Sequence, residues 1–498
     1  HTNVIALDVD TRNSTYFTGY IDGPGLTVTT PYAVSNFSLP DDHCGFVARV
    51  TPSGALNWRI FFGDFASNNS SSEGYAITID EPNSCFYVTG KYTGNVDFDP
   101  SSGVAYPTGG SGVDDGFIAK YRLNGTFVWV IGIGNSADYY GGESVGAVTY
   151  DDSGNIYCSG NFDGMVDFDP FGTNIKQSTS VYNDVFVAKY DSYGQLLWVD
   201  AISPTAQNDA LYSSGIDYRN TDKRLYATVF GGNEYDVDPS AAIALEHIPS
   251  STIQFFGVNG SYVSHFSAHG TMTNIDYDPF TDEVFVVGYQ EEESVYCFKL
   301  SHDLDYIWVN HMLGNYSYVY DVSCDDYENF WIVGETNGDG IDMDPSFLGV
   351  HHIDDGAFIG NYYKDDGSLM CAFGYDGPGL DDGSCNTVKV CPEEYDIVIG
   401  GIFKGTVDFD PSNTQTQNLI STDMDGVVAK YYDCKHGTHN SSHFNEQRGQ
   451  QVVFEKNNIP VVIQITDLSG RSVGKNYTGM VIQTMSDGTR KRVYVMPN

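Results

Sequence analysis

The sequence has few cations and no long apolar segment. It contains 24 Lys and Arg against 66 Asp and Glu, a net charge of −42. Contacts to nucleic-acid phosphates need clustered cations, so this balance excludes a nucleic-acid-binding protein. A membrane-spanning helix needs about 18 to 20 consecutive apolar residues. Because no segment reaches that length, no membrane span is predicted.

Motifs for metal clusters and hydrolases are also missing. The nine cysteines form no C-x-x-C pair, which excludes the usual zinc sites. H-E-x-x-H does not occur, and no G-x-S-x-G lies at a strand-to-helix turn of the kind that forms a nucleophile elbow, so we predict no enzyme and no certain cofactor. In an oxidising compartment some cysteines would pair, and the odd count leaves at least one unpaired within the chain. The best candidates are Cys371, Cys385, Cys391 and Cys434.

The start of the chain and its sequons indicate secretion. The first residue is His1, which we interpret as the end left by removal of a signal peptide. Asn-X-Ser/Thr sequons are acceptors for N-glycans in secreted proteins. We therefore predict a secreted, extracellular or cell-surface glycoprotein with candidate glycosylation sites at Asn13, Asn36, Asn68, Asn69, Asn124, Asn259, Asn315, Asn440 and Asn476.

One phrase, VDFDP, recurs along the chain. It occurs as GNVDFDP from Gly94, GMVDFDP from Gly164 and GTVDFDP from Gly405, with weaker forms YDVDP at Tyr235 and GIDMDP at Gly340. Most spacings between its first aspartates are 66 to 70 residues, and the spacing from Asp236 to Asp342 is 106 residues, which leaves room for an extra unit without the phrase. Such a period indicates a stacked or radial repeat.

The repeat unit predicts a seven-bladed β-propeller. Each unit has four strand-like segments with glycine-rich turns, and the seven units begin near Asn3, Gly74, Glu143, Ala210, Thr271, Asn315 and Cys385. The rungs of a β-solenoid, the alternative, are normally shorter than about 60 residues. Four of the five tryptophans, Trp58, Trp129, Trp198 and Trp308, occupy the same position in their units, where we expect them to pack between neighbouring sheets.

VDFDP has two interpretations. In an extended segment its two aspartates project to one side and the phenylalanine to the other. The carboxylates could cap a turn by accepting backbone N–H bonds, which we favour, or they could bind calcium through hard oxygen ligands. The calcium candidates are Asp97, Asp99, Asp167, Asp169, Asp408 and Asp410.

The combination of VDFDP with FVAKYDSYGQLLWV from Phe186 resembles the DFDP-type propeller repeats of secreted and cell-surface proteins common among Bacteroidetes, related to SBBP repeats. The resemblance is strongest in the second, third and seventh units. It implies a propeller fold, an extracellular location and a surface or adhesive role, and it implies no catalytic residues.

The C-terminal part differs from the repeats. We predict a propeller over residues 1–433, a polar linker over 434–448 and a small β-sandwich-like domain over 449–498. The ending from Val461, with DLSGR at Asp467, resembles the sorting domain of type IX secretion, although the usual Pro-Asn-Pro is missing. Residues 445–498 carry seven cations and four acids, a balance of +3 that leaves −45 on the rest of the chain.

Opposite charges steer molecules together. We therefore expect a structural protein, a homo-polymer whose propeller subunits assemble head-to-tail into a filament or surface layer through the C-terminal β domain. The alternative is a carbohydrate-binding or adhesive cell-surface propeller that recognises glycans, with Tyr139 and Tyr140 as stacking platforms.

Overall fold

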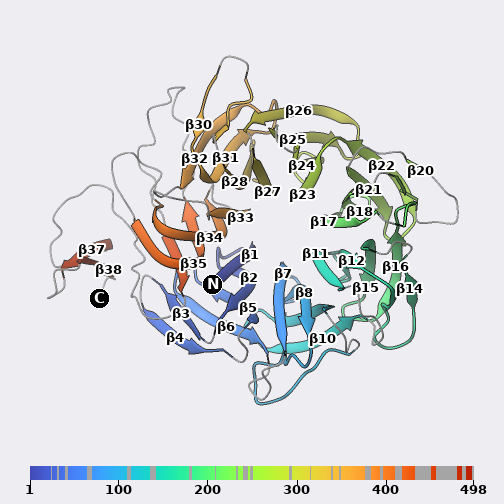
Figure 1. Ribbon diagram of the computed structural model, residues 1–498, viewed down its shortest axis with the longest axis horizontal. Helices are drawn as coiled ribbons and strands as arrows, with labels where there is room; N and C mark the ends of the chain where they lie inside the picture. The colour runs from blue at the N-terminus through green and yellow to red at the C-terminus, as the bar shows by residue number, and fades with distance from the viewer. Residues whose placement is uncertain are drawn as a thin grey trace.

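The computed structural model describes most of residues 1–431 and three short strands beyond them. The parts outside the description are 24, 31–32, 40–42, 64–69, 109–113, 135–141, 179–181, 208, 232–233, 239–244, 247–250, 291–293, 315, 338–339, 347–348, 376–382, 393–395, 410–417, 432–449, 456–478, 485–489 and 496–498. All regular secondary structure in the described residues is β-strand, and Figure 1 shows seven sheets around a common centre. The predicted all-β, seven-bladed propeller is confirmed.

Each of the first six blades has four antiparallel strands that follow chain order from the centre outward, and the sheet of blade 5 continues into the small strands β29 and β30. Blade 1 has β1 (Thr2–Val9), β2 (Thr15–Asp22), β5 (His43–Val50) and β6 (Leu56–Phe62); blade 2 has β7 (Ser71–Asp80), β8 (Cys85–Thr93), β9 (Asp115–Arg122) and β10 (Phe127–Ile133); blade 3 has β11 (Ser144–Tyr150), β12 (Ile156–Phe162), β15 (Asp184–Tyr190) and β16 (Leu196–Ile202).

Blades 4 to 6 follow the same plan. Blade 4 has β17 (Leu211–Arg219), β18 (Arg224–Gly231), β21 (Ser251–Gly257) and β22 (Tyr262–Ala268); blade 5 has β23 (Thr271–Asp278), β24 (Glu283–Gln290), β25 (Ser294–Ser301) and β26 (Tyr306–Leu313); blade 6 has β27 (Ser317–Cys324), β28 (Asn329–Thr336), β31 (Gly356–Tyr363) and β32 (Leu369–Tyr375). Blade 5 is the extra unit that the spacing of 106 residues predicted.

The third strands are buried on both faces, because each blade is covered by its two neighbours. Every residue of β15 is buried, including Lys189. Glycine allows close approach within the sheets. A Cβ at Gly90 would lie 1.9 Å from the carbonyl oxygen of Glu73, and one at Gly160 would lie 1.9 Å from that of Ser144. These strands therefore pair this closely because the positions carry no side chain.

The tryptophans pack between blades, as predicted. Trp58 of blade 1 stacks on Phe86 of blade 2 at 5.5 Å, and its Nε1 donates to the carbonyl oxygen of Leu123 in blade 2 at 3.2 Å. The other three make the same hydrogen bond into the following blade: Trp129 to Ser192, Trp198 to Val258 and Trp308 to Lys364. Each tryptophan thus joins two sheets by packing and by one directional bond.

Blade 7 closes the ring in a way that the sequence reasoning missed. Its first strands are β33 (Ser384–Val390), β34 (Ile397–Asp408) and β35 (Asn418–Tyr431), and its outer strand is β36 (Gln450–Glu455). The sequence predicts residues 449–455 as part of the separate C-terminal domain. That assignment is wrong for β36, which pairs antiparallel with β35. Burial of a sheet edge is the physical reason for its position, because β35 would otherwise expose unpaired backbone groups.

The outer edge of β36 pairs with blade 1. There β3 (Gly25–Thr29) and β4 (Val34–Ser38) form a hairpin, and β3 continues the blade 7 sheet beyond β36. A core cluster spans the junction, with Leu26 and Val28 of blade 1 packed with Phe403 and Val428 of blade 7. The first and last blades are therefore joined through β36.

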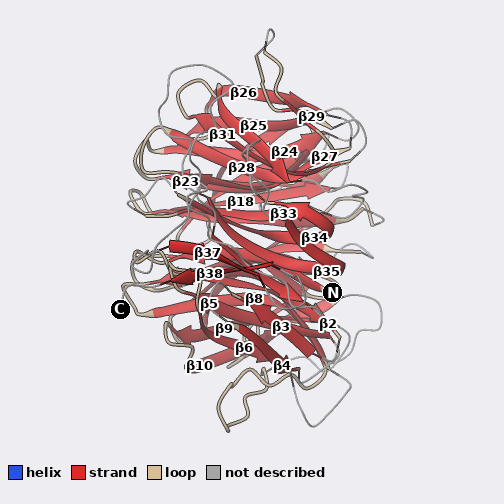
Figure 2. Ribbon diagram, turned by 90° about the vertical axis from the view of Figure 1, so that its left-hand side faces the viewer, coloured by secondary structure: helices blue, strands red, loops and turns tan. Residues whose placement is uncertain are grey.

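The remaining C-terminal strands form a separate hairpin. β37 (Gly479–Thr484) pairs with β38 (Arg490–Val495) and with no other described strand. Figures 1 and 2 place this hairpin off the outer side of the ring. The predicted sandwich-like domain stays a prediction, since most of residues 456–498 lie outside the described parts. Among the described residues of the whole chain, no helix could cross a membrane.

Candidate functional site: the clasps between blades

VDFDP follows the second strand of its blade and runs back along the outer side. We call the segment that carries the phrase the clasp; in blade 2 it is residues 94–100. Val96 and Phe98 are fully buried, and the Phe98 ring lies 5.0 Å from Phe62 in blade 1 and 4.7 Å from Phe117 in blade 2. The apolar residues of the clasp thus fill the seam between two blades.

Backbone bonds tie the clasps of blades 2, 3, 4 and 6 to the preceding blade. The amide of Gly63, just after β6, donates to the carbonyl oxygen of Asp97 at 3.2 Å. Equivalent bridges join Gly134 to Asp167, Pro204 to Tyr235 and Leu313 to Asp342. In blades 3, 4 and 6 the clasp forms a small hairpin: β13 (Met165–Asp167) with β14 (Ile175–Gln177), β19 (Tyr235–Asp236) with β20 (Leu245–Glu246), and β29 (Ile341–Asp342) with β30 (His352–Ile353). The repeated phrase is therefore a fastening between blades.

A tyrosine locks the clasps of blades 2, 3, 6 and 7 from within the same blade. The Tyr121 hydroxyl donates to the carbonyl oxygen of Phe98 at 2.7 Å. The same bond joins Tyr190 to Phe168, Tyr362 to Met343 and Tyr431 to Phe409. Burial raises the pKa of Tyr121, so its hydroxyl stays protonated and remains a donor. Sequence reasoning missed this role, although the tyrosine that ends the repeated third strand was the signal.

The first aspartate caps the turn in the clasps of blades 2, 3 and 6. Asp97 Oδ1 accepts the amides of Asp99 at 3.0 Å and Ala105 at 2.8 Å. Asp167 holds Asp169 and Asn174 in the same way, and Asp342 holds Asp344 and His351. The second aspartate is also a cap, since Asp99 accepts from Ser101 and Asp169 from Phe171. These bonds are those of the turn interpretation.

Calcium remains an untested alternative for these aspartates. A calcium ion needs about six to eight oxygen ligands. Oδ1 of both Asp97 and Asp99 already accepts backbone amides, and the described residues contain no group of three or more His, Cys, Asp or Glu placed to hold a metal. The donors present fit a backbone cap better than a cation site. Asp408 lies at the end of β34, and Asp410 lies outside the described residues.

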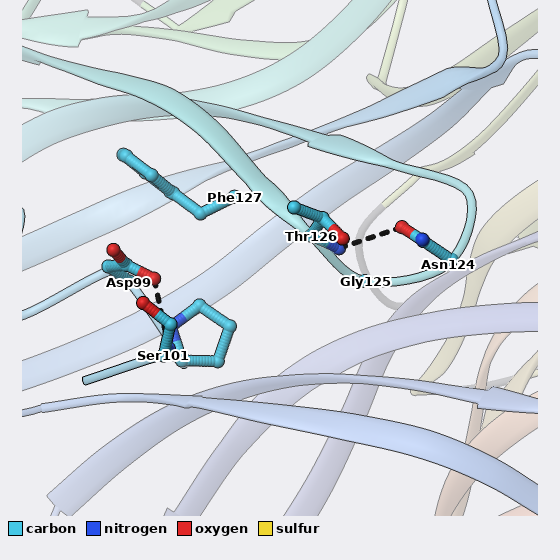
Figure 3. A pocket seen from close by; sticks show the side chains of 7 residues that line it. Asp99, Ser101, Asn124, Gly125, Thr126 and Phe127 are labelled. Atoms are coloured by element: carbon cyan, nitrogen blue, oxygen red, sulfur yellow. Dashed lines mark hydrogen bonds between the residues drawn. The ribbon is translucent and has the colours of Figure 1, made fainter. Parts of the chain in front are cut away.

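The blade 2 clasp borders a hollow of about 310 Å³ (Figure 3). The clasp contributes Asp99, Pro100 and Ser101 to its lining, and the turn between β9 and β10 and the start of β10 contribute Asn124 to Phe127. An aromatic ring beside a carboxylate, a hydroxyl and an amide is a surface on which a sugar ring could stack and form hydrogen bonds.

Three of the predicted glycosylation sites are exposed. Asn124 and Asn259 occupy the same turn in blades 2 and 4, and Asn36 lies in β4. Asn13 is half-buried in a turn with φ of 60°. The others lie outside the described residues: Asn68, Asn69, Asn315, Asn440 and Asn476. Glycosylation itself stays a prediction.

Charged side chains line the inner strands. Oxygens of Asp8, Asp217 and Asp276 each accept an amide of the next blade, from Ile79 at 2.8 Å and from Tyr277 and Cys324 at 2.7 Å. Burial raises the pKa of Asp217 to about 7, and the charge of Asp276 adds to the shift.

A lysine lies among these carboxylates. Burial alone would lower the pKa of Lys389, but Asp276, Asp321, Asp8 and Asp217 together raise it. The lysine therefore stays charged and offsets part of the acidic repulsion at the centre. The carboxylates of Asp8, Asp217 and Asp276 also join neighbouring blades, because each accepts an amide of the next blade.

The cysteines follow the predicted pairing only in part. Cys371 is in a disulfide, whereas Cys385 and Cys391 are thiols, so the prediction is wrong for these two. The other described cysteines are thiols as well, and Cys434 lies outside the described residues.

No protein-family model matches the chain, and no curated protein matches it. Among solved structures it is similar to the WD40 repeats of RRP9 (10% identity, 80% of this chain and 98% of that chain, TM-score 0.39). It is also similar to the β-propeller domain of Cps50 (Swd1) from Myceliophteria thermophila (9% identity, 80% and 96% coverage, TM-score 0.37).

A third similar structure is a protein of unknown function from Bacteroides caccae (12% identity, 59% of this chain and 80% of that chain, TM-score 0.34). All three TM-scores lie below 0.5. The resemblances to DFDP-type repeats and to a sorting domain stay predictions.

Proposed function

We propose that the protein is a secreted, non-catalytic structural subunit, and that its rings assemble head-to-tail into a filament or surface layer through the C-terminal segment, residues 449–498. One observation carries this proposal: a strand from that segment, β36, fills a sheet position between the last blade and the first. Strand addition to a sheet edge is a common way for one chain to bind another.

Two further features support assembly. The hairpin of β37 and β38 lies off the ring and pairs with no other described strand. Its second strand begins with Arg490, Lys491 and Arg492, whereas the chain as a whole has a net charge of −42. A basic hairpin beside an acidic ring favours contact with another ring, and this attraction weakens as salt screens it.

The proposal is tested by electron microscopy and light scattering of the full chain over a range of concentrations. We expect strings of rings that shorten at high salt. A chain that gives only separate rings at every concentration would refute the proposal. A variant ending at residue 455 separates the two parts of the segment, because it keeps β36 and lacks the basic hairpin.

Carbohydrate binding at the blade 2 hollow is a second candidate. Tyr139 and Tyr140, the platforms expected from the sequence, lie outside the described residues, but Phe127 beside Asp99 and Ser101 supplies an equivalent surface. A glycan array with the native chain and with Phe127→Ala tests it. Binding that Phe127→Ala removes would support this function, and an array without signal would exclude it.

A further inference from the structure

The connection that precedes the outer strand of blade 7 differs from its six counterparts. In blades 1 to 6 the third and fourth strands are joined by four or five residues, so the outer strand must belong to its own sheet. In blade 7, 18 residues separate Tyr431 at the end of β35 from Gln450 at the start of β36. A fully extended chain of that length spans at most about 60 Å. The covalent chain therefore permits β36 to reach a second ring.

The position that β36 occupies is paired on both sides. We call this position, between β35 and β3, the closure slot. Along β35 the register runs through five pairs, from Gly426 opposite Phe454 to Lys430 opposite Gln450. Along β3 three residues pair with the other edge of β36, with Val28 opposite Phe454. Without β36 two sheet edges would lose their partner strand, which is unfavourable for a soluble protein.

The occupant of the closure slot need not come from the same chain. Exchange of an identical strand between copies preserves every contact in the slot, so it costs little free energy beyond that of association. Each chain has one slot and one β36. When the donor and the acceptor are different copies, the contact is heterologous, and repetition gives an open filament rather than a closed pair unless the rotation closes.

We propose that β36 of one copy fills the closure slot of the next copy, so that strand exchange is the bond that links the rings. This inference rests on the proposed assembly function and names its partner, a second copy of this chain. It assigns the basic hairpin that follows β36 to the surface of the acceptor ring, where it strengthens a contact already made by the strand.

Cysteines introduced at opposite positions of β35 and β36 show which chain supplies β36. Residues opposite each other in an antiparallel pair are about 4.5 to 5.5 Å apart, within the range that a disulfide spans. Val427 lies opposite Val453, and Val428 opposite Val452. Because successive pairs alternate in geometry, testing both covers the more favourable one. Burial raises the pKa of the native Cys158 and Cys297 thiols, which limits their interference.

The decisive form of the experiment uses two single variants, Val427→Cys and Val453→Cys, co-expressed and oxidised, with Val428→Cys and Val452→Cys as the second pair. A disulfide-linked dimer of the two variants requires exchange, and we expect it. In the double variant with Val427→Cys and Val453→Cys we expect a ladder of linked chains on a non-reducing gel. The control is Ala188→Cys with Val199→Cys in blade 3, whose strands are joined by a short turn and must link within one chain.

The outcomes separate this inference from the proposed function. Linked monomers alone, in preparations that still form strings of rings, would overturn strand exchange and leave assembly intact. Linked monomers in preparations that form no strings would overturn both. No link with either pair, while the blade 3 control does link, would show that β36 does not occupy the closure slot and would also overturn the inference.

Discussion

Blades 3 and 7 carry the same repeat but complete their sheets differently. In blade 3, β16 follows β15 after five residues, and the clasp reaches back to blade 2 through the bridge of Asp167 to Gly134. In blade 7, the outer strand comes from beyond an 18-residue connection and is held by a hairpin of blade 1. A clasp that is close in sequence joins most pairs of consecutive blades. The last and first blades are joined instead by β36, which follows a much longer connection.

Removing the distant strand should have the largest effect. A chain that ends at residue 449 lacks β36, whereas one that ends at residue 455 keeps it. We expect the shorter chain to lose on the order of 5 kcal/mol of unfolding free energy, at about 1 kcal/mol for each lost backbone hydrogen bond, or to aggregate through its open edges. Thermal unfolding of both variants measures this. Equal melting temperatures would show that β36 contributes nothing to closure.

The local fastening can be tested within one clasp of blade 3. Phe168 is fully buried in the seam, and Phe171 in the same turn is 64% exposed. Phe168→Ala should cost about 3 to 5 kcal/mol, as for a large core side chain. Phe171→Ala should stay within about 0.5 kcal/mol. Denaturant unfolding compares the two, and similar losses would contradict the role given to the clasp.

Buried ion pairs provide a third test, at the seam of blades 5 and 6. Lys364 Nζ lies 2.6 Å from Asp278 Oδ2, and both side chains are 2% exposed. Lys364→Met leaves that carboxylate buried without its cation, which should cost about 3 to 5 kcal/mol. The matched change Lys120→Met removes a bond to the carbonyl of Ser192 and should cost about 1 kcal/mol. Unfolding curves that rank the two variants in the reverse order would be inconsistent with this seam.

Acidity should affect the centre of the ring differently from the seams. Because the folded pKa of Asp217 is raised to about 7, the folded state binds more protons there than the unfolded state between about pH 4 and 7. The protonated carboxyl of Asp217 therefore contributes fully to stability below about pH 4. This contribution is lost as the pH rises through about 7 and the carboxyl ionises. Asp217→Asn, which keeps an acceptor oxygen, should raise the melting temperature at pH 8 and have little effect at pH 4. An equal effect at both pH values would count against this account.

Chelation should have the smallest effect. If the clasp aspartates are backbone caps, EDTA leaves the melting temperature unchanged, whereas Asp97→Ala lowers it by removing an acceptor from two amides. A fall in melting temperature with EDTA that added calcium reverses would favour the metal interpretation. Calcium would then need oxygen ligands in addition to those that the described residues supply.

Much of this fold could be predicted from repetition. The predicted unit starts lie within three residues of β1, β7, β11, β17, β23, β27 and β33, because glycine turns and apolar strands recur in the same order in each unit. Trp58, Trp129 and Trp198 were placed correctly because each lies four residues after a turn glycine. The tyrosine locks were missed because Tyr121 is one of 36 tyrosines, and composition does not separate a structural tyrosine from the rest.

The position of β36 could not be predicted from local pattern. Residues 450–455 have the composition of any short strand, and their partners lie far away in sequence, at residues 426–430 and 27–29. Pairing at such a separation is set by which sheet edges remain open once the ring has formed. The blade 2 hollow was missed for a similar reason, since Asp99 and Phe127 come together only when the clasp folds back over its blade.

A density map of native assemblies, with residues 432–449 traced from β35 to β36, tests strand exchange most directly. We expect the trace from each ring to enter the closure slot of the neighbouring ring. A trace that returns from β35 to the slot of its own ring would contradict it.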